Sequence, residues 1–491
     1  MLKATKIQTL GNRHFLFLAL WIFVALLFQF QKIITLPPLS IHQGAQADRA
    51  SIALNYYRVS MNFLEPRVME TATKDGITPC EFPLVNYVVA CFYKLFGYHP
   101  FWYRFLMWCL MGAGLWAVFD ILCLWLANKW AALLVAFTWF FSPILDFYTP
   151  NFLPDTASLA LVLLALRQWF LYNSKASKKR IIWFTVFAAL ACLIKITSLL
   201  FVITVVLVSL IQFIAKHEKI KFIGSAFLIF LSVFCWYYYC QWLEQKVGGS
   251  YFLMSMVMPS SLNEFREWFH IFYANWFFQI YNWQQWIFIA FGLVSIPFVN
   301  EKLYIKLFSV IALIGALCIY ILMAGQFRYH DYYSITLLPI FLFFIAFGFK
   351  WLFSLKPFLA YSLLLVVCVW GLIDAKNNFR LRYKPGEYLY QTFFEPSDFK
   401  GVDAWLTQNG VTQNDKILAA FDPNPNTLLY FLNRRGCRTF DHNLSYVNGK
   451  LELYKNLVTN DSLQFFKQYP ETRNHLAFKS AYNKWSLYNL K

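Results

Sequence analysis

The stretch that decides the fold runs from Ile181 to Ile214 and reads IIWFTVFAALACLIKITSLLFVITVVLVSLIQFI. Lys195 is the only charged residue within it. A helix rises about 1.5 Å per residue and needs about 20 apolar residues to cross roughly 30 Å of hydrocarbon. This run is long enough for two membrane-spanning helices, and we expect them to be divided at Lys195.

Similar apolar runs recur along most of the chain. We expect spans at about Phe15–Phe30, Phe101–Leu126, Trp130–Leu145, Thr156–Tyr172, Ile181–Ile194, Leu199–Ile214, Phe222–Tyr239, Trp286–Val299, Lys306–Ala324, Ile335–Phe349 and Phe358–Ile373. Runs of this length predict an all-α polytopic membrane protein with about 11 transmembrane helices.

The overall composition agrees with a membrane protein. Hydrophobic residues make up 59% of the 491 residues and charged residues only 14%. Soluble domains carry about 25% charged residues, so this chain cannot cover a water-facing surface of its size. The net charge of +18 is therefore interpreted as membrane topology and attraction to lipid head groups, not as nucleic-acid binding.

The short connections between spans predict the orientation. With eleven spans, one side of the membrane receives Lys3, Lys6, Arg13, Lys129, Lys175, Lys178, Lys179, Arg180, Lys216, Lys219, Lys221, Lys302, Lys306, Lys350 and Lys356. The opposite short connections hold little more than Lys195 and Arg328. Positive residues stay in the cytoplasm, so we expect a multi-pass inner (plasma) membrane protein with a cytoplasmic N-terminus and a periplasmic C-terminus.

Three polar segments then fall outside. The predicted transmembrane domain, residues 1–374, carries a first loop at about 31–100 and a second large loop at about 240–284. The remaining residues, 375–491, predict a small periplasmic α/β domain. Its expected elements are helices at Val402–Gln408, Asn426–Asn433 and Leu451–Gln468, and strands at Lys416–Phe421 and near Cys437–Phe440, with a turn at Asp422–Pro425.

Cys80 and Cys437 both lie in outside segments, whereas most of the other cysteines lie in spans. In an oxidising compartment they could form a disulfide between loop and tail. Two separate thiols fit the sequence equally well.

Three acids of the outside segments are candidate site residues. Asp48, shortly after the first span, could accept a proton or a cation at the lipid–water boundary. It could equally cap the helix that we expect to follow it. Glu81 is either an ordinary loop acid or part of a site. Asp155, after Pro154, opens the fourth span and suits the N-terminus of a helix, which is its simplest role.

Candidate cations lie on the same side. Lys195 could extend towards water from a membrane edge, or it could meet a lipid phosphate. Arg328, His330 and Asp331 gather three ionisable groups among tyrosines before the tenth span. Such a cluster is unusual at an interface, and we expect it to serve function.

These residues resemble bacterial polytopic glycosyltransferases of the C-type fold, the group of protein O-mannosyltransferases (glycosyltransferase family 39) and the lipid A aminoarabinose transferase. The resemblance covers about residues 10–375 and rests on the order of its parts. The first part is a span that begins in the cytoplasm and is followed shortly by Asp48. The others, in order, are Glu81-Phe82-Pro83-Leu84, Lys94-Leu95-Phe96-Gly97 with Arg104, Pro154-Asp155, Lys195 and Arg328-Tyr329-His330.

The resemblance implies a reaction and a set of roles. The enzyme would move a hexosyl or pentosyl unit from a polyprenyl-phosphate donor to a hydroxyl of a lipid, glycan or protein, with inversion, at the periplasmic face. Asp48 would be the general base. Lys195 and Arg328 would steady the leaving phosphate, and Glu81 and Asp155 would line the sugar and acceptor pocket. Arg104, His330 and Asp331 would be further substrate-binding residues.

Two departures from the family pattern bear on the donor. Arg49 follows Asp48 where the mannosyltransferases carry Asp-Glu, and Glu81 stands near a position where the lipid A enzyme has Lys. The resemblance implies no certain cofactor and leaves open whether a divalent cation binds beside Asp48. Two other functions remain as alternatives. One is a transporter or flippase, which would place ionisable residues at mid-span, and the other is an O-antigen polymerase or ligase handling lipid-linked saccharides.

Overall fold

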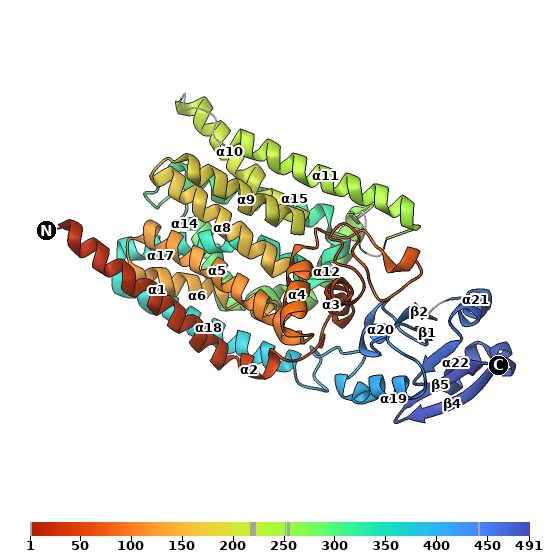
Figure 1. The fold of residues 1–491 in the computed structure, drawn as a ribbon. Coiled ribbons are helices and arrows are strands. Elements are labelled where there is room, and N and C mark those ends of the chain that lie inside the picture. Colours follow the sequence, from red (N-terminus) through yellow and green to blue (C-terminus); the bar gives the residue numbers. More distant parts are fainter. Residues whose placement is uncertain (1, 217–221, 251, 253–255, 440–441) are drawn as a thin grey trace. The chain divides into compact units, whose positions relative to one another are not determined.

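The computed structural model describes residues 2–216, 222–250, 252, 256–439 and 442–491 (Figure 1). Its contacts divide the chain into two compact units. The helical unit comprises Met1–Thr35, Arg104–Tyr238 and Met254–Lys384. The mixed unit comprises Leu36–Tyr103, Tyr239–Leu253 and Pro385–Lys491. The tail from Pro385 thus shares a unit with the first loop, and the separate domain at 375–491 stays a prediction.

Helices make up the helical unit. They are α1 (Leu2–Leu27), α2 (Phe30–Ile33), α5 (Pro100–Leu126), α6 (Lys129–Phe140), α7 (Pro143–Tyr148), α8 (Asp155–Ser174), α9 (Lys178–Ile194), η2 (Ile196–Ser198), α10 (Leu199–Lys216), α11 (Ile223–Val247), α12 (Leu262–Phe272), η3 (Tyr273–Phe277), α13 (Phe278–Ile280), α14 (Trp283–Ser295), α15 (Leu303–Leu322), α16 (Ala324–Phe327), η4 (Asp331–Leu337), α17 (Leu338–Leu355) and α18 (Pro357–Arg382). Helices α5 and α11 continue into the mixed unit.

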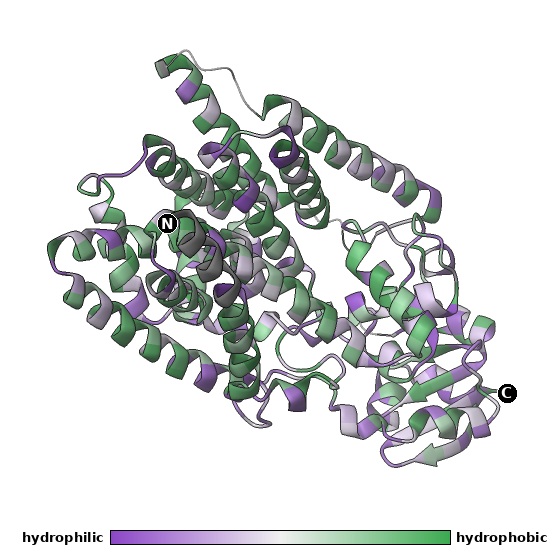
Figure 2. Cartoon of the chain, turned by 60° about the vertical axis from the view of Figure 1, so that its left-hand side comes forward, coloured by the Kyte–Doolittle hydropathy of each residue, from purple (hydrophilic) through white to green (hydrophobic). Residues whose placement is uncertain are grey.

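The chain is a polytopic helical membrane protein, as its composition predicts. Within the described residues, six helices are long and apolar enough to cross a membrane, and shorter apolar helices accompany them. Each of the eleven predicted runs overlaps at least one helix. Apolar residues cover most of these helices in Figure 2, because a span in lipid must present apolar side chains on all sides.

Two breaks between helices bear on the predictions. Helix α9 ends at Ile194, Lys195 is extended, with a φ of −142°, and α10 begins at Leu199. This confirms the division at Lys195. The third span, however, ends at Phe140 and not at Leu145. Ser142 caps the separate short helix α7, with Pro143 in its first turn, where proline is tolerated.

The mixed unit combines the first loop with a small sheet. The loop contributes α3 (Gln43–Arg58), η1 (Lys74–Gly76) and α4 (Leu84–Phe96). The tail contributes η5 (Pro396–Phe399), α19 (Val402–Gln408), β1 (Lys416–Ala419), α20 (Thr427–Phe431), β2 (Arg435–Arg438), α21 (Leu444–Tyr454), β3 (Asn456–Thr459), α22 (Ser462–Gln468), η6 (Pro470–Asn474), β4 (Leu476–Tyr482) and β5 (Trp485–Leu490).

The sheet has the order β2-β1-β3-β5-β4. Strand β1 is parallel to β2 and β3, and β5 is antiparallel to β3 and β4. The helix predicted at Val402–Gln408 and the first strand are present. The helix predicted over Leu451–Gln468 is wrong, because β3 interrupts it between α21 and α22. Both residues at the centre of β3, Leu457 and Val458, are fully buried in the sheet.

Candidate functional site

Asp48 lies in the second turn of α3, in the mixed unit. The residue at the N-cap of this helix is His42, with a φ of 56°, so Asp48 is not the cap. Its carboxylate Oδ1 accepts a hydrogen bond from Nδ2 of Asn426, at 2.7 Å. Burial raises the pKa of the Asp48 carboxyl to about 6, although the Asn426 bond and the charge of Arg49 both lower it. A carboxyl with this pKa can take up a proton near neutral pH.

Glu81 forms an ion pair with the residue after Asp48. Arg49 Nη2 lies 2.6 Å from Glu81 Oε2. The Arg49 carbonyl accepts a hydrogen bond from Asn86 Nδ2 at 2.7 Å, and its guanidinium lies 4.6 Å from the centre of the Phe252 ring. The structure therefore brings Asp48, Arg49 and Glu81 into one polar cluster of the mixed unit.

Asp155 and Lys195 form a second pair, in the helical unit. Asp155 occupies the first turn of α8, as predicted. Lys195 Nζ lies 3.4 Å from Asp155 Oδ1, and both side chains are buried. The ammonium also lies 5.9 Å and 5.5 Å from the rings of Tyr332 and Tyr333. The end of the Lys195 side chain therefore lies among protein groups and does not extend into water.

Asp331 forms a fully buried pair with Arg382, which is also in the helical unit. Arg382 Nη2 donates to Asp331 Oδ2 at 3.0 Å and to Gln279 Oε1 at 3.1 Å. Tyr148 donates to Asp331 Oδ1 at 2.7 Å. Among the described residues, Arg382 Nε and Nη1 are buried without a hydrogen-bond acceptor. A guanidinium with open donors suits an anionic or hydroxyl-rich ligand.

Arg382 is not among the residues predicted from the sequence. It stands in the last turn of α18, the final span, where a basic residue is usual and gives no signal of its own. Its importance comes from Asp331 and Tyr148, which are distant in the sequence. The nearest available signal was the predicted Arg328–Asp331 cluster.

The members of that predicted cluster contact different partners. The Arg328 guanidinium lies 4.4 Å from the Trp268 ring centre and 4.3 Å from that of Tyr329. His330 precedes η4 and its ring is 5.3 Å from that of Tyr332. Asp331 instead pairs with Arg382. Arg328 thus packs against aromatic rings, and Asp331 is held by an ion pair with Arg382.

Arg104 is fully buried near the end of the final span. Its Nη1 donates to the Pro150 carbonyl at 2.6 Å and lies 3.4 Å from the Tyr383 hydroxyl. Its guanidinium stacks 4.6 Å from the Phe152 ring centre. Arg104 thus contacts the loop before Asp155 and the residue after Arg382. This places Arg104 with the charged groups of the helical unit.

A small, mostly apolar pocket lies in the helical unit. Its lining includes Trp21, Phe28, Trp108, Phe379 and the acid Asp146. Such a lining suits a ligand with an apolar chain.

The predicted site residues therefore lie on two units. Asp48 and Glu81 belong to the mixed unit, and Arg104, Asp155, Lys195, Arg328, His330 and Asp331 belong to the helical unit. Among the described residues, no three His, Cys, Asp or Glu side chains are grouped so that they could hold a metal ion.

Cys80 and Cys437 belong to separate hydrophobic clusters. Cys80 packs with Ile52 and Tyr56, whereas the Cys437 thiol is 3.3 Å from the Tyr454 hydroxyl. The structure therefore shows two separate thiols and not a disulfide.

The sequence matches no protein-family model and no curated protein. Its fold resembles that of ArnT from Cupriavidus metallidurans in the apo state, with a TM-score of 0.63 at 11% identity over 96% of this chain and 97% of that one. The same protein bound to undecaprenyl phosphate gives 0.62 at 11% identity, with the same coverage. The arabinofuranosyltransferase AftD from Mycobacteria gives 0.52 at 11% identity, over 95% of this chain and 41% of that one. These proteins are polytopic glycosyltransferases of the C-type fold, and the chain has that fold.

Proposed function

We propose that the protein is an inverting membrane glycosyltransferase that uses a polyprenyl-phosphate-linked sugar. The acceptor is a hydroxyl of a lipid, glycan or protein at the periplasmic face of the inner membrane, with the N-terminus in the cytoplasm and the tail in the periplasm. ArnT, which shares the fold, has been solved with undecaprenyl phosphate bound. The fold supports a lipid carrier for this chain, and the residues below support the chemistry.

The carboxylate of Asp48 takes the proton from the acceptor hydroxyl. The hydroxyl oxygen then forms a bond to the anomeric carbon as the bond from that carbon to the phosphate oxygen breaks. The electron pair of the broken bond leaves with the polyprenyl phosphate, and the anomeric centre inverts. A base with a pKa near the working pH suits this proton transfer.

Negative charge develops on the leaving phosphate, so cations near it lower the barrier. The family resemblance supports this role for Lys195 and Arg328. The open donors of Arg382 make it a further candidate, because a guanidinium binds phosphate oxygens in a fork. Glu81 and Asp155 bind the sugar or the acceptor, assisted by Arg104, His330 and Asp331.

The proposal rests chiefly on the surroundings of the Asp48 carboxyl. In a chain with this fold, the acid after the first span is a carboxyl held by a neutral amide, with a pKa of about 6. This arrangement suits a group that exchanges a proton. A carboxyl that served only packing would be expected to form a permanent ion pair or to cap a helix.

The test uses purified protein in detergent with a panel of polyprenyl-phosphate hexoses and pentoses. We expect release of polyprenyl phosphate with at least one donor and an acceptor present. Asp48→Asn keeps the side-chain shape but cannot accept the proton, and it should lower the rate by about 10²–10⁴-fold. Asp415→Asn, at a half-buried acid of the tail that accepts hydrogen bonds from Thr412, is the matched control and should keep full activity.

Full turnover by Asp48→Asn would refute the assignment of the base. Movement of the lipid-linked sugar across vesicles without cleavage would instead support the transporter alternative. Reporter fusions that place residue 400 in the cytoplasm would overturn the topology and with it the periplasmic reaction.

A further inference from the structure

The amide of Asn426, in the tail, contacts the first loop through both of its polar atoms. Nδ2 donates to Asp48 Oδ1 at 2.7 Å, and Oδ1 accepts from the main-chain N–H of Glu70 at 2.8 Å. The side chain is fully buried. Because Oδ1 is held by an N–H, the orientation of the amide is fixed, and its N–H₂ group must face the carboxylate.

The turn before α20 holds Asn426 rigidly. The Asp422 carboxylate accepts hydrogen bonds from the N–H groups of Leu428, at 2.6 Å, and Asn424, at 2.9 Å. Arg438 donates to the carbonyls of Asp422 and Pro423 at 3.0 and 2.8 Å. The turn follows β1, at the carboxyl end of parallel strands, where α/β sheets commonly place functional groups.

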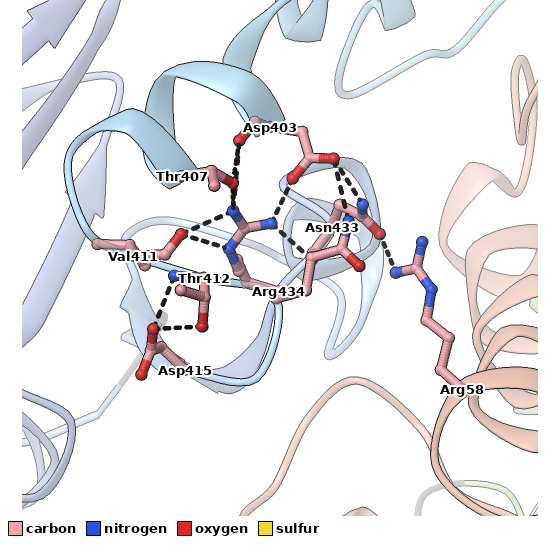
Figure 3. A network of polar contacts seen from close by, with 9 residues as sticks. Arg58, Asp403, Thr407, Val411, Thr412, Asp415, Asn433 and Arg434 are labelled. Carbon is pink, nitrogen blue, oxygen red and sulfur yellow. Dashed lines mark hydrogen bonds and ion pairs between the residues drawn. The ribbon is translucent and has the colours of Figure 1, made fainter.

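The far end of α20 is also anchored, as Figure 3 shows. Asn433 accepts a hydrogen bond from Arg58, the last residue of α3, and donates to Asp403 at 2.9 Å. The neighbouring Arg434 is fully buried and donates to the Val411 carbonyl at 2.8 Å. Helices α3 and α20 are therefore joined at the Asp48 end and at the Arg58 end.

The first loop also adds an extended segment to the sheet edge. Thr71 N–H donates to the Gly436 carbonyl at 2.7 Å, and Gly436 N–H donates to the Met69 carbonyl at 3.1 Å. Position 436 must be glycine, because a Cβ there would lie 1.8 Å from the Ile417 carbonyl oxygen. Main-chain pairing of this kind fixes register and leaves little freedom for movement of the loop against the sheet.

From these contacts we propose that the tail is a positioning element for the transfer reaction. Asn426 orients the Asp48 carboxylate and stabilises its proton-accepting form through a hydrogen bond. This inference rests on the proposed function, in which Asp48 is the base. Asn426 acts through Asp48, so it is a positioning residue.

Other charged groups face Asp48 and set the background for this effect. Arg49 on α3 and Arg438 on β2 favour the ionised carboxylate, whereas Glu81 of the first loop and Asp422 of the turn disfavour it. Burial raises the pKa of the Asp422 carboxyl to about 7. Because the pKa values of Asp422 and Asp48 are close, the titration of Asp48 must be identified as the signal that is present in the wild type and lost in Asp48→Asn.

Removal of the Asn426 donor should raise the pKa of Asp48. A hydrogen bond to a charged form favours that form, and we expect a shift of about one pH unit on its loss. The rate at pH 6 should then fall about fivefold more than the rate at pH 8, because the ionised fraction changes mainly at the lower pH. A structural defect would lower both rates equally.

Two variants and one control separate these effects. Asn426→Ala loses both hydrogen bonds. Asn426→Asp keeps the oxygen that binds the Glu70 N–H but loses the donor to Asp48. The new carboxyl at position 426 should raise the pKa of Asp48 further, and so move the low-pH side of the rate profile to higher pH. Asn443→Ala removes the cap of α21 and should lower the stability of the protein without moving the pH profile.

Two readouts keep the proposal testable whatever the activity. The first is the pH profile of polyprenyl-phosphate release. The second is an infrared pH titration of the carboxyl band that disappears in Asp48→Asn. We expect both midpoints to rise in Asn426→Ala and Asn426→Asp, and neither to move in Asn443→Ala. If both midpoints stay unchanged in the two Asn426 variants, the proposal is overturned. If the band shifts but the wild type transfers no sugar, the positioning of Asp48 stands and the proposed function fails.

Discussion

Asp48 of the mixed unit is held differently from Asp155 and Asp331 of the helical unit. In the helical unit, Asp155 lies 3.4 Å from Lys195, and Asp331 lies 3.0 Å from Arg382. In the mixed unit, Asp48 accepts a hydrogen bond from the neutral amide of Asn426. Buried ions of opposite sign hold each other in the charged state. A carboxyl bound to an amide can gain or lose a proton.

This difference suggests a division of work. In the proposed reaction, the cations of the helical unit hold the leaving phosphate, for which Arg382 has open donors. In the same reaction, the Asp48 carboxyl of the mixed unit takes up the proton. The three predictions that follow would break or sharpen this comparison.

The largest effect on stability is expected from Asp331→Asn. The change leaves Arg382 buried with an uncompensated charge, which should cost about 3–5 kcal/mol in the free energy of unfolding. Asp48→Asn breaks no ion pair and should cost less than about 1 kcal/mol. Denaturant titration in detergent, followed by tryptophan fluorescence, measures both. The double variant Asp331→Leu with Arg382→Met should recover much of the loss. Equal losses in the two single variants would erase the difference between the units.

Lys195→Ala should have the next largest effect, on activity. If its ammonium stabilises the leaving phosphate, the rate should fall by about 10²–10³-fold, while the protein still folds and inserts. Lys356→Ala, an exposed lysine at the start of α18, is the control and should be fully active. Should Lys195→Ala retain its activity but lose stability, the lysine would serve only to neutralise Asp155.

The smallest effect is the pH dependence of the wild type. Asp48 must be unprotonated to act as the base, and its pKa is about 6. The rate should therefore be halved near pH 6 and fall about tenfold for each further unit of acidification. Initial rates between pH 5 and 8, with unfolding checked at each pH, test this. A flat profile over that range would show that proton transfer to Asp48 does not control the rate.

Local signals predicted much of the helical unit. Apolar run length located each span, because a helix in lipid satisfies its main-chain groups internally and needs no distant partner. Lys195 marked the break between α9 and α10, because a charged side chain is costly inside lipid. The end of the third span was misplaced, because the cap at Ser142 begins a new helix inside an unbroken apolar run.

Pairing between distant residues could not be predicted in the same way. Asp331 was found as a candidate, but its partner Arg382 was missed. Asn426 was assigned to the start of a helix, and its contact with Asp48 joins residues that are 378 positions apart. Likewise β3 was predicted as helix, because its strand pairing depends on β1 and β5 and leaves no local periodicity.

The sequence by itself determined that the chain crosses the membrane many times and which residue types gather in the segments between spans. These properties follow from hydrophobicity and charge, which act residue by residue along the chain. The tertiary structure alone decided which charges pair, and that the tail reaches Asp48. Hydrogen bonds and ion pairs act over about 3 Å, so their partners are defined only when the chain has folded.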